Sequence, residues 1–206
     1  MDSFVDELPK AELHLHLVGS ASVPTVLELA RRHPGGNGVP PGSEVPRTEP
    51  ELRAFFEFRD FPHFAEVYGA VSALVRDPAD VAALVTGAAR DLAGQNVRYV
   101  ELTVTPYTFT SVGMPVRELT SALDLAADEA GREHGVRIGY IFDIASEYGA
   151  EAARATLDHA LSCPPEALTG FGLSGIEQAR PAYQAEFRSV FASAIAAGLH
   201  SVPHAG

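Results

Sequence analysis

The chain has 206 residues, with 27 acidic and 15 basic side chains, so its formal net charge is −12 with the histidines neutral. Hydrophobic residues make up 46% of the chain and charged residues 20%, a balance that allows a buried core and excludes wholesale disorder. Nucleic acids and anionic membrane surfaces select for clustered lysine and arginine, so this acidic balance argues against both as the main partner.

The N-terminal part predicts a strand followed by a helix. Residues 11–17 alternate leucines with polar residues, so the two histidines of this predicted strand, His14 and His16, share one face. Apolar residues then recur at helical spacing over residues 23–32. Residues 33–50 (HPGGNGVPPGSEVPRTEP) are rich in glycine and proline, which predicts a surface loop within a domain.

The rest of the chain predicts helices that alternate with strands. From Glu51 to Asp77 the sequence is aromatic and helical. The spacing of apolar residues after this stretch predicts helices over 78–94, 115–134, 149–161 and 182–197. It predicts strands over 97–104, 136–143, 168–173 and 199–204. Because strands that alternate with helices of about ten or more residues are typical of βα units, the sequence predicts an α/β fold with five parallel strands.

Three histidines lie at or near the ends of predicted strands. His14 and His16 form an H-x-H pair, and His204 comes at the end of the fifth strand. An H-x-H pair on a strand projects both rings to one side, and neutral imidazole is a common zinc ligand. In a parallel α/β barrel the carboxyl ends of the strands gather, so His204 could meet the pair there. Ordinary hydrogen bonding in a core or groove is the alternative interpretation.

Three motifs resemble those of the adenosine deaminase family. LPKAELHLHLVGSAS, which starts at Leu8, resembles the opening motif of the family, GFGLSGIE (residues 170–177) its fourth-strand motif, and SVPHAG the beginning of its HAGE motif. They occur in the family's order with comparable spacing. The resemblance implies an incomplete (β/α)8 TIM barrel of about five parallel strands, in a single domain over residues 1–206, with a helical insertion after the first strand and helix.

The same resemblance implies a function and a set of site residues. Members of the family are zinc-dependent and deaminate purines by hydrolysis. By match, one zinc ion per chain is held by His14, His16 and His204, while Gly175 faces the purine and His16 also approaches the sugar. The expected partners are therefore a small-molecule purine and water.

The family's remaining catalytic groups are expected beyond this sequence. The resemblance places the proton-donating glutamate directly after Gly206, and a hydroxide-orienting histidine and a metal-binding aspartate further on. We therefore expect a chain truncated on its C-terminal side, with no catalytic acid of its own and little activity by itself. The alternative is an inactive short form that acts as a metal-binding or interaction module.

Two features bear on the substrate. Where many relatives have an acidic residue, this sequence has Val18, which offers no acceptor to a ribose hydroxyl. That favours a 5′-modified adenosine such as aminodeoxyfutalosine, or a free base, over adenosine. Phe58 and Phe61 are candidate lid residues over the purine, although aromatic residues at helical spacing more often belong to a core.

Other chemistry-bearing residues give weaker signals. Asp143 and Glu147 could flank a cleft, although a helix-capping or solvated role is the simpler interpretation, and His159 is expected to be solvated. Cys163 has no partner thiol, and no window approaches the ~18 apolar residues of a membrane span. The sequence therefore predicts a reducing, cytoplasmic environment.

Overall fold

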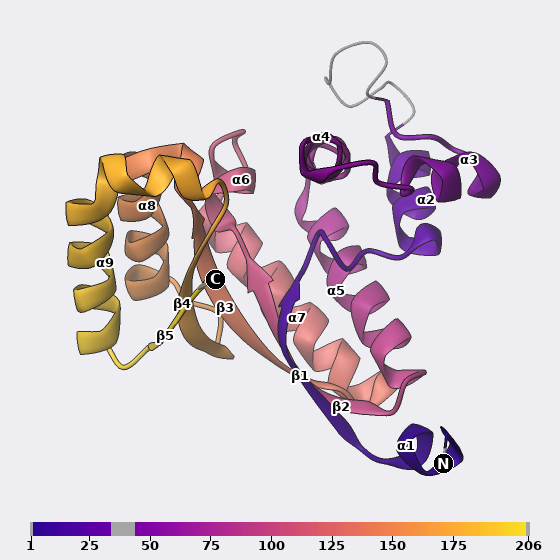
Figure 1. Cartoon of the computed structure of the whole chain (residues 1–206). Coiled ribbons are helices and arrows are strands. Elements are labelled where there is room, and N and C mark those ends of the chain that lie inside the picture. The colour runs from indigo at the N-terminus through magenta and orange to yellow at the C-terminus, as the bar shows by residue number, and fades with distance from the viewer. Residues whose placement is uncertain (1, 34–43, 205–206) are drawn as a thin grey trace.

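In the computed structural model, which describes residues 2–33 and 44–204, five parallel strands form one sheet (Figure 1). The strands are β1 (Lys10–His16), β2 (Val97–Val104), β3 (Arg137–Ala145), β4 (Leu168–Ser174) and β5 (His200–Pro203). Each strand pairs in parallel with the next one along the chain, so their order across the sheet is β1-β2-β3-β4-β5. This arrangement confirms the predicted α/β half-barrel.

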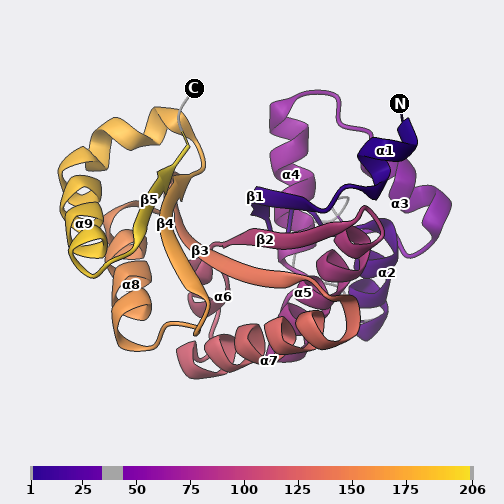
Figure 2. The same cartoon turned by 90° about the horizontal axis from the view of Figure 1, so that it is seen from below.

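Helices connect the strands and cover the outer face of the curved sheet (Figure 2). Helices α5 and α7 pack against each other, and α7 and α8 both contact β3. The α-helices are α1 (Asp2–Glu7), α2 (Val23–Arg32), α3 (Glu49–Phe55), α4 (Phe61–Ser72), α5 (Pro78–Ala93), α6 (Pro106–Thr110), α7 (Val116–His134), α8 (Gly149–Ser162) and α9 (Gln184–Ala196), with 3-10 helices η1 (Ser146–Tyr148) and η2 (Glu177–Tyr183). No helix of the described residues is long and apolar enough to cross a membrane.

Helices α4 and α5, which follow the first strand and helix, begin at side-chain caps. Asp60 accepts a hydrogen bond from the backbone N–H of His63 at 2.8 Å and starts α4, which Figure 1 shows on the side where the strands end. Asp77 and Asp80 form a reciprocal capping box at the start of α5. Asp80 is also fully buried and lies 2.7 Å from His33 Nε2, so it ties the end of α2 to the start of α5.

Strand β3 runs through the centre of the core, and every residue after Arg137 in it is buried. Tyr140 donates its hydroxyl proton to Leu123 O in α7 at 2.7 Å, and the Phe142 ring lies 4.8 Å from the ring of His159 in α8. Successive strand residues point to opposite faces, so the even-numbered residues of β3 face the helices. The odd-numbered residues therefore face the concave side of the sheet.

Two glycines in β4 allow β5 to approach closely. A Cβ atom on Gly170 would lie 3.1 Å from Val202 Cγ2, and one on Gly172 would lie 3.1 Å from Val202 O. A side chain at either position would therefore require the neighbouring atoms to shift by a few tenths of an ångström.

The predicted strands agree with the structure to within two residues, and β2 coincides with its predicted range. The prediction was wrong where α3 begins at Glu49, inside the expected loop. The aromatic stretch divides into α3 and α4 because Asp60 and Pro62 start a new helix. Residues 34–43 of the expected loop lie outside the described residues, and the short helices α1 and α6 were not predicted.

His159 is buried, so the expectation that it is solvated was wrong. Its side chain is 3% exposed, and its Nε2 atom lies 2.9 Å from Thr120 Oγ1. Thr120 donates its own hydroxyl proton to Cys163 O at 2.7 Å, so it accepts from the Nε2–H group of a neutral His159. Burial lowers the pKa of His159 from 6.5 to about 4.

We expect acid to destabilise the fold through His159. Between pH 6.5 and about 4, the unfolded chain binds a proton at this imidazole that the folded chain does not bind. Its contribution is therefore fully present above pH 6.5 and falls by about 3 kcal/mol toward pH 4. In urea unfolding at several pH values, His159→Gln should flatten this slope, whereas His200→Gln, at an exposed position, should retain it. An unchanged slope in His159→Gln would contradict the assignment.

Candidate metal centre

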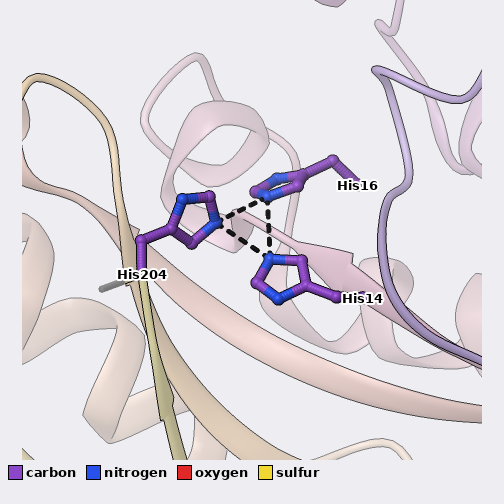
Figure 3. A group of neighbouring side chains, drawn as sticks. All are labelled: His14, His16 and His204. Carbon is purple, nitrogen blue, oxygen red and sulfur yellow. Dashed lines mark hydrogen bonds between the residues drawn. The ribbon is translucent and has the colours of Figure 1, made fainter. Parts of the chain in front are cut away.

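Three histidine side chains from the two outer strands of the sheet converge on one point (Figure 3). His14 and His16 are separated by one residue on β1, so their rings project from the same face. His204 follows β5, and its backbone N–H donates to Leu173 O at 2.9 Å, which extends the β4–β5 pairing to the histidine. The Nε2 atoms lie 2.9 Å apart for His14 and His204, 3.0 Å for His16 and His204, and 3.3 Å for His14 and His16.

Hydrogen bonds alone do not account for this triangle of nitrogens. A neutral Nε2 atom is either a donor or an acceptor, so among three mutually adjacent Nε2 atoms at least two must have the same role. Such a pair repels at hydrogen-bond distance. If all three protons are on Nδ1, three lone pairs point toward a common centre, which is the arrangement that a cation requires.

The spacing of the three nitrogens fits a zinc ion. Nitrogen ligands bind tetrahedral zinc at ~2.0–2.1 Å, which places two of them ~3.3 Å apart. The separations of 2.9, 3.0 and 3.3 Å are close to this value. The structure thus brings together the three residues predicted as ligands, and three imidazoles leave a coordination position open for water or substrate.

Burial and neighbouring charges shift the pKa values of His16 and His204. Desolvation lowers the pKa of His16, the Asp143 carboxylate opposes this shift, and His204 and His14 lower the pKa further. Desolvation also lowers the pKa of His204, with further lowering by His14 and Arg180 and an opposing effect of Asp143. Lowered pKa values favour the neutral imidazole, which is the form that binds a metal ion.

Asp143 lies near the end of β3, on the side of the sheet where the histidines meet. Its side chain is 1% exposed, so the preference for a helix-capping or solvated role was wrong. Its Oδ1 atom accepts a hydrogen bond from Thr105 Oγ1 at 2.5 Å, and its Oδ2 atom accepts one from Ser174 Oγ. The three residues come together because parallel neighbouring strands end side by side.

Gly175, which was predicted to face the purine, follows β4 with a φ of +81°. A Cβ atom there would overlap Glu147 Oε2 and lie 2.8 Å from Ser146 N. Glu147 Oε2 accepts from the N–H of Ile176 at 2.9 Å, and Ser146 Oγ donates to Ile176 O at 2.7 Å. Local packing therefore requires a glycine here, and its contact with a purine stays a prediction.

Val18 is buried and lines a water-sized cavity of about 10 Å³, together with Tyr68 and Thr105. Because Thr105 also binds Asp143, this cavity adjoins the carboxylate. Burial and the Asp143 charge raise the pKa of the Tyr68 phenol above its usual value. Sequence reasoning missed Thr105 and Tyr68. The position of Thr105, directly after a predicted strand, was the available signal, whereas nothing in its spacing distinguished Tyr68.

The two candidate lid residues lie in the aromatic part of the insertion. Phe58 is 49% exposed and Phe61 is 64% exposed. Their rings lie 5.2 Å and 5.9 Å from the ring of Phe64. Their ring contacts in the described part of the chain are with neighbouring aromatic residues and not with the three histidines, so the lid role stays a prediction.

Comparison with known families identifies the group to which this site belongs. The family model described as adenosine deaminase matches residues 9–206. The chain belongs to the adenosine deaminase family. Its membership rests on a match that begins just before β1 and includes all three histidines.

This member of the adenosine deaminase family matches only part of the length of two curated relatives. An aminodeoxyfutalosine deaminase from Streptomyces avermitilis is 46% identical over 209 residues, which cover 100% of this chain and 56% of the relative. An adenine deaminase from Rhodospirillum rubrum is 32% identical over 205 residues, which cover 99% of this chain and 58% of the relative. The chain thus spans a little over half the length of both.

Solved structures of similar proteins share the half-barrel. An amidohydrolase from Burkholderia ambifaria with bound Zn has 26% sequence identity and a TM-score of 0.83, over 99% of this chain and 54% of that one. The Arabidopsis protein ADAL complexed with GMP has 25% identity and a TM-score of 0.78, over 99% and 60%. One similar structure therefore holds Zn and another holds a purine nucleotide.

Gly175→Ala should destabilise the protein more than Gly113→Ala. Both glycines have positive φ angles, +81° and +107°, but a Cβ atom on Gly113 meets nothing within 4 Å. Gly113→Ala therefore adds only backbone strain, ~1–2 kcal/mol, whereas Gly175→Ala adds the overlap with Glu147 and a further ~1–3 kcal/mol. Urea unfolding measures both, and adding Glu147→Ala to Gly175→Ala should recover part of the difference. Equal losses in the two single variants would show that the overlap does not matter.

Proposed function

We propose that the protein containing this chain is a zinc-dependent enzyme that hydrolytically removes the 6-amino group of a purine nucleoside. The observation that carries the proposal is the convergence of His14, His16 and His204, whose Nε2 atoms lie 2.9 to 3.3 Å apart. The site lies where parallel strands end, which is where barrel enzymes carry their chemistry. Family membership and the Zn in a similar structure support the same function.

Purine deamination needs the chemistry that such a site offers. Water must be activated to attack C6 at neutral pH, and a bound zinc ion lowers the pKa of its water toward ~7. The three histidines would hold the ion through unprotonated Nε2 atoms, and the lowered pKa values of His16 and His204 favour that state near neutral pH. The resemblance to the family places the glutamate that protonates the purine ring directly after Gly206, and Gly206 itself lies outside the described residues.

For the substrate, we propose a 5′-modified adenosine such as aminodeoxyfutalosine. The relative that is 46% identical is named for this activity, against 32% for the adenine deaminase. Val18 supports the choice because its buried, apolar side chain cannot accept a hydrogen bond from a ribose hydroxyl. The purine would approach Gly175, and Phe58 and Phe61 would cover it. Purine and water are the proposed partners, in the cytoplasm.

Replacing His14 or His204 should abolish stoichiometric zinc binding. Each side chain supplies one of three nitrogens, so His14→Ala and His204→Ala should each lower the zinc affinity of the full-length protein by at least ~100-fold. Mass spectrometry of metals in dialysed protein should find one zinc per chain in the wild type and in His200→Gln, which lies outside the cluster. Variants of the cluster that keep their zinc would refute the site.

Turnover should depend on zinc and should favour the 5′-extended nucleoside. Removing zinc from the full-length protein with a chelator should abolish deamination, and adding it back should restore activity. The value of kcat/KM should be at least ~10-fold higher for aminodeoxyfutalosine than for adenosine or adenine, because Val18 offers adenosine no hydrogen bond. A preference for adenosine would overturn the substrate proposal. Stoichiometric zinc without deamination of any of the three would instead favour a metal-binding module.

A further inference from the structure

Asp143 is a buried acidic group whose presence the zinc ligands do not explain. It lies on β3, the central strand of the sheet, while the three histidines belong to the outer strands. Burial of a carboxylate costs free energy unless hydrogen bonds or a positive charge compensate it. None of the ion pairs in the described part of the chain involves Asp143.

The orientation of Asp143 follows from the alternation along β3. Its neighbour Phe142 faces helix α8, where its ring lies 4.8 Å from that of His159. Asp143 therefore faces the concave side, toward which the histidines also project. On the next strand it pairs with Gly172, where a Cβ atom would lie only 3.1 Å from Asp143 Cβ. The glycine leaves the space on this side of the sheet to the aspartate.

Two hydroxyl groups hold the carboxylate in place. Thr105 Oγ1, after β2, donates to Oδ1 at 2.5 Å, and Ser174 Oγ, at the end of β4, donates to Oδ2. With both oxygens accepting, the hydrogen bonds suit an ionised carboxylate. Two neutral donors fix its position but leave its negative charge without a counter-ion.

We propose that Asp143 is a positioning residue that supplies the counter-charge for the divalent cation held by His14, His16 and His204. This inference rests on the zinc site proposed above. The three histidine ligands are neutral and offset none of the charge of a divalent ion, and the single metal-binding aspartate expected after Gly206 would offset only one of its two positive charges. A fixed carboxylate on the concave face offsets part of that charge. Its electrostatic attraction raises the affinity of the site for the ion, although the carboxylate does not itself coordinate the ion.

The strand register supports this role. His16 is level with Ile141 through Thr103, and Asp143 is the next residue of β3 on the same face. On the other side, Asp143 pairs with Gly172, which pairs with Val202, two residues before His204. The carboxylate therefore lies on the concave face between the levels of the histidines from the two outer strands, where its charge acts on a cation that they hold.

The test measures zinc affinity in the full-length protein by competition with a chromophoric chelator. Asp143→Asn removes the charge with almost no change of shape, and Asp143→Ser removes it in a smaller polar side chain. Both should weaken zinc binding by ~10–100-fold. The matched control is Ser174→Ala, which deletes one hydrogen bond and keeps the charge, and it should remain within about threefold of the wild type. Because either neutral variant suffices, failure of one to fold leaves the test intact.

A second readout separates the counter-charge from a structural role. Thermal unfolding of the zinc-free neutral variants should occur at or above the wild-type temperature, because a buried charge has been removed, while the stabilisation gained on adding zinc should shrink. Unchanged zinc affinity in both neutral variants, or an equal loss in Ser174→Ala, would overturn the inference. Those results leave the zinc site itself standing, whereas a wild-type protein that binds no zinc would remove the proposed function.

Discussion

The candidate metal centre depends on how tightly the sheet curls between its two outer strands. His14 and His204 are 190 residues apart in sequence, and their Nε2 atoms lie 2.9 Å from each other. The curvature that brings them together accumulates over four parallel pairings, β1 to β5. The site is therefore a property of the whole sheet rather than of any one loop.

Two neighbouring residues of β3, Phe142 and Asp143, face opposite sides of the sheet, and the polar groups beside them differ. Phe142 faces the helices, where the one buried imidazole that it contacts, His159, stays neutral and bonds to Thr120. Asp143 faces the concave side and carries its charge between two hydroxyl donors. On the helix side, burial lowers the pKa of His159 and keeps the imidazole neutral. On the concave side, a carboxylate that accepts two hydrogen bonds faces the same way as the three histidines.

Much of the fold and part of the site could be predicted from the sequence because both have local signals. The strand 97–104 and the helix from Pro78 stand out by apolar periodicity and turn residues, and the H-x-H pair needs only strand alternation. The break between α3 and α4 was missed because an aromatic run hides the cap at Asp60. The burial of Asp143 and His159 could not be predicted in this way, since it depends on which strands and helices lie beside them. Tertiary contacts, not local pattern, decide whether a polar side chain is solvated.

Ligands on both outer strands link the shape of the sheet to cation binding. An ion held by β1 and β5 together would bind more tightly to the curled sheet than to a flatter one, in which His204 would lie away from His14 and His16. By thermodynamic linkage, the ion would then stabilise the curl by the same free energy that the curl adds to its affinity. Sheet geometry and metal affinity would thus be two measures of one coupled equilibrium.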